Sequence, residues 1–241
     1  LHSNYVERKS TMKKLNLLFG TLSMLSLGVA NAGTLVLDSF NYNPALALDV
    51  ASNGDFSDTG TRASLESGAT ANYTLSYLNG TGSSSLDANV FSAGVLSYNE
   101  DSLVNGNLLV EYSLIGLPIT TLDFTGYSAF YFDIAKVDGN GGFDILLTLT
   151  DDDGTQISAN YHIDPTLTPI TYMATFNSMM SDPDFADFDF SMVSTASTFI
   201  TSDGTGDDFS LTEVGLIPEP SALAILGLGL IGLGLSRRKL V

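Results

Sequence analysis

Apolar and polar side chains alternate along much of the central part of the chain. In the clearest run, from 143 to 150, every second residue is apolar, and Leu146 is the one apolar residue on the polar face. An Asp/Gly turn at 151–155 joins this run to a second alternating run from 156 to 163. Because a period of two places successive side chains on opposite faces of a strand, these runs predict a β-hairpin with one buried and one wet face.

The same pattern recurs in shorter segments. They cover 34–40, 73–77, 95–98, 107–114, 127–134, 170–176, 198–201 and 209–214. Between 33 and 217 no stretch shows a sustained apolar stripe of helical period, and 179–190 fits either a short helical turn or a loop. About ten short strands separated by turn residues predict an all-β chain folded as an antiparallel β-sandwich.

The charge of the chain is distributed unevenly. Of its 241 residues 27 are acidic and 9 are basic, and seven of the basic residues lie near the two ends. The stretch 33–217 keeps 2 basic residues against 25 acidic ones, a formal charge of −23. Such a surface repels phosphate backbones, so we expect no nucleic-acid partner. The chain has no cysteine, which excludes a disulfide framework, a thiolate metal site and a cysteine nucleophile.

The N-terminal segment has the pattern of an export signal. Two lysines precede an apolar run over 15–29, and the small residues Ala30 and Ala32 follow it. A charged start, a short apolar stretch and small residues at the cleavage positions are typical of a secretory signal peptide. We expect a signal peptide over 12–32 that signal peptidase cuts before Gly33; a short anchor or a buried helix is the alternative.

The C-terminal segment 215–241 has three parts. They are the triplet Pro218, Glu219 and Pro220, an uncharged apolar run over 221–235, and a basic tail over 236–241 with Arg237, Arg238 and Lys239. As a helix the run is about 22 Å long, short for a bilayer but tolerable with local thinning. Basic residues favour the cytoplasmic side, so we expect a transmembrane helix that leaves the acidic body outside. Prolines break helices, which leaves Glu219 in extended backbone that a protease can reach.

This combination resembles the PEP-CTERM sorting signal of exported bacterial proteins, a tail also labelled an ice-binding protein C-terminal domain. The resemblance implies recognition by an exosortase, a membrane-embedded cysteine transpeptidase, and cleavage near the triplet. It also implies a Gram-negative host, an inner-membrane intermediate, and delivery to the cell surface or extracellular matrix together with exopolysaccharide or biofilm. A plain C-terminal membrane anchor without processing is the alternative.

Two short segments at the ends of the body also resemble a known fold. Leu37–Phe40 and Asp207–Leu211 are similar to the first and last strands of carbohydrate-binding-type jelly rolls. The resemblance implies that these strands pair and that a structural calcium ion lies beside them. We therefore expect a jelly-roll-like sandwich over 33–214.

Clustered carboxylates make Ca²⁺ the one candidate cofactor. Calcium takes roughly six to eight oxygen ligands, which aspartates and backbone carbonyls supply. The candidate ligands are Asp151 and Asp153 in the hairpin turn, and Asp203, Asp207 and Asp208 before the last strand. A further cluster contains Asp138, Asn140 and Asp144. The alternative is that Asp and Gly only form turns here.

A polysaccharide is the candidate ligand. Tyr127, Tyr131 and Asp133 share one face of the strand at 127–134, and apolar residues occupy the other face. An outward tyrosine beside an aspartate can stack on a sugar ring and accept hydrogen bonds from its hydroxyls. The alternative is that both faces are covered and the tyrosines belong to the core. The lack of tryptophan, the largest aromatic platform, weakens the sugar interpretation.

Signals for catalysis are weak. The body contains a single histidine, His162, on the polar face of its strand, and we expect it to be a solvated surface residue. No nucleophile elbow, HExxH motif or P-loop occurs. We therefore predict a non-catalytic surface or matrix protein. A calcium-stabilised carbohydrate-binding module is the alternative, and a glycan hydrolase with two carboxylates, for which no pair can be named, is the second.

Overall fold

The structure is a computed structural model that describes residues 34–41, 46–51, 57–62, 68–80, 85–91, 94–114, 123–139 and 141–219. The predicted signal peptide with Ala30, Ala32 and Gly33 lies outside these residues. So do Pro220, the apolar run at 221–235 and the basic cluster Arg237, Arg238 and Lys239. Across the described ranges, no helix is long and apolar enough to cross a membrane.

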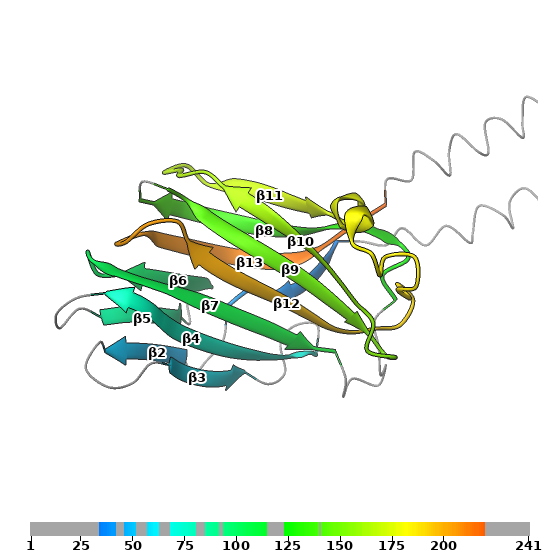
Figure 1. The fold of residues 1–241 in the computed structure, drawn as a ribbon, viewed down its shortest axis with the longest axis horizontal. Helices are drawn as coiled ribbons and strands as arrows, with labels where there is room; N and C mark the ends of the chain where they lie inside the picture. Colours follow the sequence, from blue (N-terminus) through cyan, green and yellow to red (C-terminus); the bar gives the residue numbers. More distant parts are fainter. Residues whose placement is uncertain are drawn as a thin grey trace, which may run out of the picture. The chain divides into compact units, whose positions relative to one another are not determined.

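Thirteen strands in the described residues form two sheets, which we call sheet A and sheet B (Figure 1). Sheet A contains β1 (Leu35–Asp38), β2 (Leu46–Ala51), β5 (Ser85–Phe91), β6 (Val95–Glu100), β8 (Tyr127–Asp138), β11 (Ile170–Thr175) and β13 (Asp208–Pro218). Its order is β11-β8-β13-β6-β5-β2, and β1 also pairs with β13. Every pairing in the sheet is antiparallel.

Sheet B has the order β10-β9-β12-β7-β4-β3 and is also antiparallel throughout. Its strands are β3 (Ser57–Arg62), β4 (Thr70–Gly80), β7 (Val104–Ser113), β9 (Phe143–Asp151), β10 (Gln156–Ile163) and β12 (Val193–Ser202). A short 3₁₀ helix, η1 (Phe176–Ser181), follows β11. The pairing of neighbouring strands aligns their residues across both faces of sheet B.

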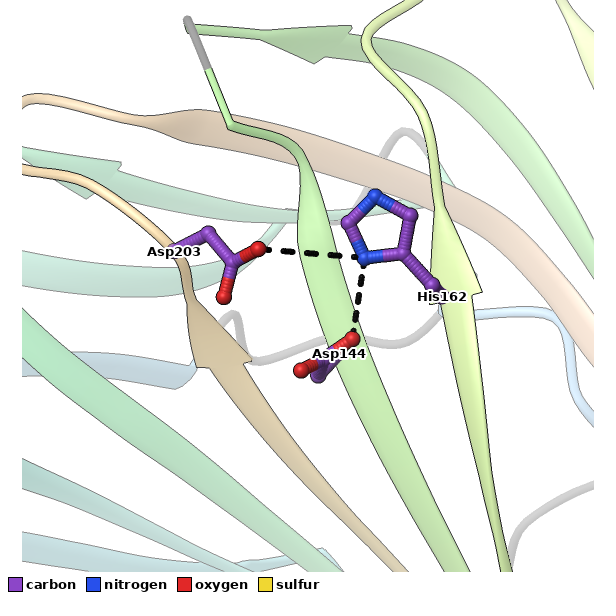
Figure 2. A group of neighbouring side chains, drawn as sticks. All are labelled: Asp144, His162 and Asp203. Carbon is purple, nitrogen blue, oxygen red and sulfur yellow. Dashed lines mark hydrogen bonds and ion pairs between the residues drawn. The ribbon is translucent and has the colours of Figure 1, made fainter.

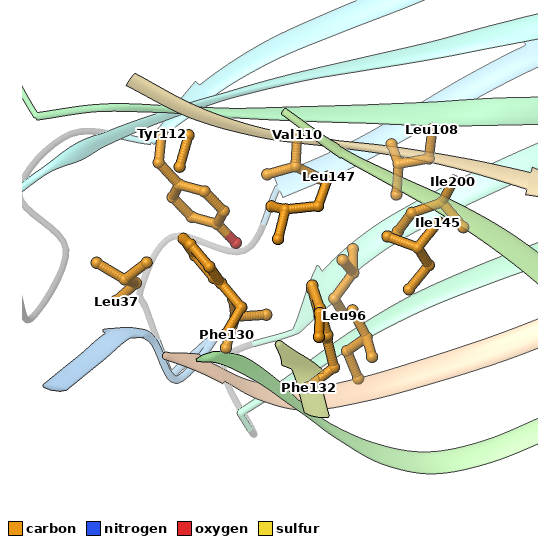
Figure 3. Packing of buried hydrophobic residues seen from close by; sticks show 14 of the residues in the cluster. Leu37, Leu96, Leu108, Val110, Tyr112, Phe130, Phe132, Ile145, Leu147 and Ile200 are labelled. Atoms are coloured by element: carbon orange, nitrogen blue, oxygen red, sulfur yellow. The ribbon is translucent and has the colours of Figure 1, made fainter. Parts of the chain in front are cut away.

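The two sheets enclose one apolar core (Figure 3). Val110 and Leu147 of sheet B point toward Phe130 of sheet A, and all three side chains are fully buried. The alternation of the sequence explains this arrangement, because every second residue of a strand faces the partner sheet. The predicted all-β sandwich of two antiparallel sheets is therefore confirmed, whereas the jelly-roll assignment stays a prediction.

Several local predictions can be compared with the strands. The hairpin is confirmed: β9 and β10 pair in continuous register, and Gly154 in their turn has a φ of 89° that favours glycine. The first and last strands pair, since β1 lies beside β13. Segment 179–190 contains the end of η1 followed by turns. The sequence interpretation missed three strands, of which β3 has no apolar residue and so no alternation to detect.

A buried polar network joins the two sheets near β1. Asp38 of sheet A accepts hydrogen bonds from the Tyr73 hydroxyl at 2.7 Å and from the Phe40 amide at 2.7 Å. Arg62 of sheet B lies 3.4 Å from the same carboxylate. A buried charge is tolerated only when it is paired and hydrogen-bonded. The network therefore fixes how the edge of sheet B is placed against β1.

Candidate functional site

The outer face of sheet B carries an apolar row that crosses its strands. The register aligns one residue from each strand: Asn160, Leu146, Phe199, Leu109, Thr74 and Thr59. Leu146, Phe199 and Leu109 occupy adjacent strands, and we call these three residues the apolar row. Directly paired side chains on one face have Cβ atoms about 4.5–5.5 Å apart, so the three form one continuous surface.

The strand period forces these side chains outward. Each lies between two residues of the same strand that face the core, as Leu146 lies between Ile145 and Leu147. Leu146 is 39% exposed, and Phe199 and Leu109 are half-buried. Single exposed apolar residues are normal on a protein surface, whereas these three lie side by side and form one small apolar patch.

Polar rows flank the apolar row on both sides. One contains His162, Asp144, Thr201, Asn107, Ser76 and Ser57. The other contains Ser158, Thr148, Ser197, Glu111, Asn72 and Thr61. At about 4.8 Å per strand a row of six strands spans about 24 Å, and successive rows are about 7 Å apart. The face thus offers an apolar strip bordered by hydroxyl, amide and carboxylate groups.

Three titratable side chains meet at one end of this face (Figure 2). His162 Nδ1 lies 2.9 Å from Asp144 Oδ1 and 3.9 Å from Asp203 Oδ2. The Nε2 atom on the other side of the ring lies 3.6 Å from Asp164 Oδ1. The hydrogen bond to Asp144 and the surrounding negative charges raise the pKa of His162 above its usual value. His162 is exposed, as the sequence predicted, but it belongs to a cluster that the sequence interpretation did not assemble.

The predicted sugar-binding residues lie elsewhere. Tyr131 and Asp133 are on the outer face of sheet A, whereas Tyr127 packs against the core with its ring 6.3 Å from that of Phe124. Tyr131 is only 4% exposed, because its ring lies over Gly215, where an added Cβ would come within 2.6 Å of the ring.

Both polar groups of this pair are engaged. The Tyr131 hydroxyl donates to Glu213, and burial together with this bond raises the pKa of Tyr131 well above its usual value. Asp133 accepts a hydrogen bond from Thr171 at 2.6 Å. The sugar-binding role of Tyr127, Tyr131 and Asp133 stays a prediction, and the burial of Tyr131 argues against stacking on its ring.

The predicted calcium ligands form two separate groups at opposite ends of β9. Val193 of β12 pairs with Asp151, whereas Ser202, next to Asp203, pairs with Phe143. The buried Asp151 carboxylate accepts the backbone amides of Thr155 at 2.8 Å and Asp189 at 3.2 Å. These bonds fix the turn, and Asp153 is exposed in the same turn.

The second group of predicted ligands adjoins a buried carboxylate that the sequence interpretation missed. Glu100 accepts hydrogen bonds from the Tyr98 hydroxyl at 2.5 Å, the Gly106 amide at 2.9 Å and the Ser202 hydroxyl at 2.8 Å. Its other oxygen accepts the amide of Asp207 at 3.3 Å. With four donors on its two oxygens, Glu100 is held firmly by the surrounding backbone and side chains.

The neighbouring aspartates are also held by this part of the fold. Asp207 is buried, and its carboxylate lies where a Cβ on Gly139 or Gly204 would collide with it. Asp208 accepts the backbone amide of Glu100 at 3.1 Å. Burial raises the pKa of Glu100 within this cluster. Calcium binding by Asp151, Asp153, Asp203, Asp207 and Asp208 stays a prediction.

Comparison with a family model decides the nature of the C-terminus. Residues 216–239 match the model described as "PEP-CTERM protein-sorting motif". The chain carries a PEP-CTERM sorting motif. The prediction made from Pro218, Glu219, Pro220 and the basic cluster is therefore confirmed for this segment, of which the structure describes only the residues up to Glu219. No curated protein matches the chain significantly.

The chain is similar to several solved structures at low sequence identity, family 11 carbohydrate-binding modules among them. A family 11 carbohydrate-binding module of the cellulosomal cellulase Lic26A-Cel5E of Clostridium thermocellum is 14% identical, with 79% of this chain and 97% of that chain covered at a TM-score of 0.41. The solution structure of CtCBM11 is 15% identical, with 80% of this chain and 99% of that chain covered at a TM-score of 0.44. PfGH50B is 14% identical with a TM-score of 0.38; the match covers 52% of this chain and spans a fifth (20%) of that one.

Proposed function

We propose that this chain is an exported, non-catalytic surface or matrix protein that binds an extracellular polysaccharide through the outer face of sheet B. The observation that carries the proposal is the apolar row of Leu146, Phe199 and Leu109 between two polar rows. A sugar ring has apolar C–H faces and a rim of hydroxyl groups. A strip of apolar side chains bordered by hydrogen-bonding groups is complementary to both features at once.

The dimensions of the face support a chain-like ligand. The six aligned strands extend over about 24 Å, which is longer than a single sugar ring requires. No wall or lid is needed for a polymer that passes across an open sheet, and its many repeats compensate for weak contacts at each ring. A linear polysaccharide lying along the rows therefore fits the face better than an isolated monosaccharide does.

Charge restricts the class of polysaccharide. In the described part of the chain, Arg62, Lys136 and His162 each lie within ion-pair distance of an aspartate carboxylate. The surface around them is strongly acidic, with a formal charge of −23 over 33–217. An acidic surface repels uronate-rich or sulfated polymers. We infer that the ligand is a neutral polysaccharide or one that carries amino groups.

The full chain, purified in detergent micelles and immobilised for interferometry, tests this proposal. The panel contains neutral β-glucans and galactans, an amino-bearing polymer such as chitosan, and alginate as the anionic representative. We expect binding within the first two classes and none to alginate. Phe199→Ser should weaken binding about tenfold, the loss expected for one buried aromatic contact.

The matched control lies on the other sheet. Met173 is an apolar residue on the outer face of β11 and is 57% exposed, so Met173→Ser removes exposed apolar surface outside the apolar row. Its binding should equal that of the unaltered chain. The proposal is contradicted if no neutral or amino-bearing polymer binds, or if Phe199→Ser and Met173→Ser weaken binding equally.

Delivery of the protein rests on its C-terminal motif. The exosortase is the processing partner that we propose, acting on the triplet around Glu219 while the apolar run at 221–235 holds the chain in the membrane. Replacing Arg237, Arg238 and Lys239 with neutral residues should impair membrane retention, because these charges fix the orientation of the span. Fractionation that still finds the altered chain in the membrane with its normal topology would contradict this mechanism.

A further inference from the structure

Three neighbouring strands bring an imidazole and two carboxylates together at the end of the outer face of sheet B. Asp144 lies on β9, and His162 lies directly opposite it on β10. Asp203 follows the end of β12, two residues beyond the point where Thr201 pairs with Asp144. Figure 2 shows the Asp144 and Asp203 carboxylates both directed at the same ring nitrogen. We propose that Asp144, His162 and Asp203 bind a divalent transition-metal ion of the Zn²⁺ type.

The spacing of the donor atoms matches a coordination sphere. Zinc binds imidazole nitrogen and carboxylate oxygen at about 2.0–2.2 Å, which places neighbouring donors about 3.0 Å apart at right angles and about 3.4 Å apart at tetrahedral angles. His162 Nδ1 lies 2.9 Å from Asp144 Oδ1 and 3.9 Å from Asp203 Oδ2. One donor atom from each residue lies within 4.8 Å of the other two. A small rotation of the Asp203 side chain is enough to close the set around one ion.

The backbone already holds the donors in place. The strand register fixes Asp144 against His162, and the Asp203 amide donates to the Gly142 carbonyl at 3.2 Å. Gly141 is also required, because a Cβ at that position would lie 2.7 Å from the Cβ of Asp203. Metal binding therefore needs side-chain adjustment but no rearrangement of the sheet.

The far side of the imidazole ring also faces a carboxylate. Histidines that bind a metal through one nitrogen usually direct the other N–H to a carboxylate, which orients the ring. Asp164 lies on that side, with Oδ1 3.6 Å from His162 Nε2. In the structure Nδ1–H donates to Asp144, so an ion bound at Nδ1 displaces that proton, and the ring then keeps its remaining proton on Nε2, the nitrogen that faces Asp164.

The donor chemistry selects the class of ion. Ca²⁺ and Mg²⁺ prefer oxygen ligands, whereas an imidazole suits Zn²⁺, Ni²⁺ and Cu²⁺. A neutral imidazole and two carboxylates carry a charge of −2, which a divalent ion balances. All three side chains are partly exposed, so water completes the coordination. An open position facing solvent makes this a surface site that is distinct from the apolar row.

Titration calorimetry of the full chain in detergent, prepared without a polyhistidine tag and stripped with EDTA, tests the proposal with Zn²⁺ alone. We expect saturable binding of one ion, which His162→Gln and Asp203→Asn each weaken at least tenfold. Two matched controls should bind Zn²⁺ like the unaltered chain: His2→Gln, which removes the other histidine, and Asp133→Asn, which removes an acid from sheet A.

Two further measurements separate this site from general attraction of cations to an acidic surface. Ca²⁺ binding, if any occurs, should be equal in His162→Gln and the unaltered chain. Co²⁺ should give visible absorption bands that disappear in His162→Gln and persist in His2→Gln. Zn²⁺ binding that His162→Gln leaves unchanged, or no saturable binding in the folded chain, would overturn the proposal. Both outcomes are independent of whether any polysaccharide binds.

Discussion

Replacement of Leu146 by asparagine is the most quantitative test of the apolar row. Asparagine has the same number of side-chain heavy atoms as leucine and the same branch at Cγ, and the position is on the outer face of β9, so the core stays intact. Leu146 is 39% exposed, which corresponds to about 65 Å² of apolar surface available to a ligand. At about 25 cal/mol per Å², burial of this surface contributes about 1.6 kcal/mol to binding. Its loss should weaken binding up to about 15-fold.

Calorimetry with the tightest-binding polysaccharide of the panel measures this change. Met173→Asn applies the same type of substitution on sheet A and should change the dissociation constant less than twofold. Thermal unfolding of both variants establishes that the sandwich is intact. Unchanged affinity in a folded Leu146→Asn chain would refute the assignment of the apolar row, and equal losses in the two variants would show that the contact is not specific to sheet B.

Three further predictions concern other parts of the fold. Glu100→Ala leaves the buried donors of Tyr98, Gly106 and Ser202 without their acceptor, and it should lower the free energy of unfolding by about 3 kcal/mol in urea titrations; a loss below 1 kcal/mol would contradict the network. In EDTA-treated protein, NMR titration should find the pKa of His162 above its usual value. The Asp144→Asn substitution should lower this pKa, because the hydrogen bond to Asp144 contributes most to raising it. Because the pKa of His162 is raised in the folded state, its interaction with Asp144 stabilises the fold fully at pH values below the pKa of the unfolded chain. This stabilisation disappears as the pH rises through the pKa of the folded chain. Gly215→Ala should lower the melting temperature, because its Cβ would collide with Tyr131 and the Leu35 carbonyl.

The layer architecture could be predicted because alternation is a local signal. The run at 143–150 and its partner at 156–163 determine both strands and the turn between them, and the observed register follows directly. The opposition of Asp144 and His162 is a consequence of that register. In contrast, β3 lies at the edge of sheet B with a wholly polar sequence, so it leaves no periodic signal.

The apolar row could not be predicted because it depends on pairing between distant strands. Leu109, Leu146 and Phe199 are each a single apolar residue on the polar face of their own strand. Only Leu146 was identified as such an exception from the sequence. Only the order β9-β12-β7 aligns the three side chains, and this order joins segments that are far apart in the chain. The approach of Asp203 to His162 depends on the same pairing.

The interpretation of Tyr131 shows a different limit. Its strand position predicts correctly that the side chain leaves the inner face, since it lies on the outer face of sheet A. The sequence does not show that Gly215 of β13 lies beside it and leaves space for the ring to fold down. Whether an outward aromatic residue is available to a ligand therefore depends on a glycine in another strand.

The central claim is that the outer face of sheet B binds the polysaccharide. The most direct measurement is an NMR titration of the isotope-labelled chain with the polysaccharide that the panel identifies. The account predicts that the largest chemical-shift changes occur at Leu109, Leu146 and Phe199 and at their neighbours in the flanking polar rows. Changes confined to β8 and β11 around Tyr131 and Asp133 would contradict it and would place the ligand on sheet A.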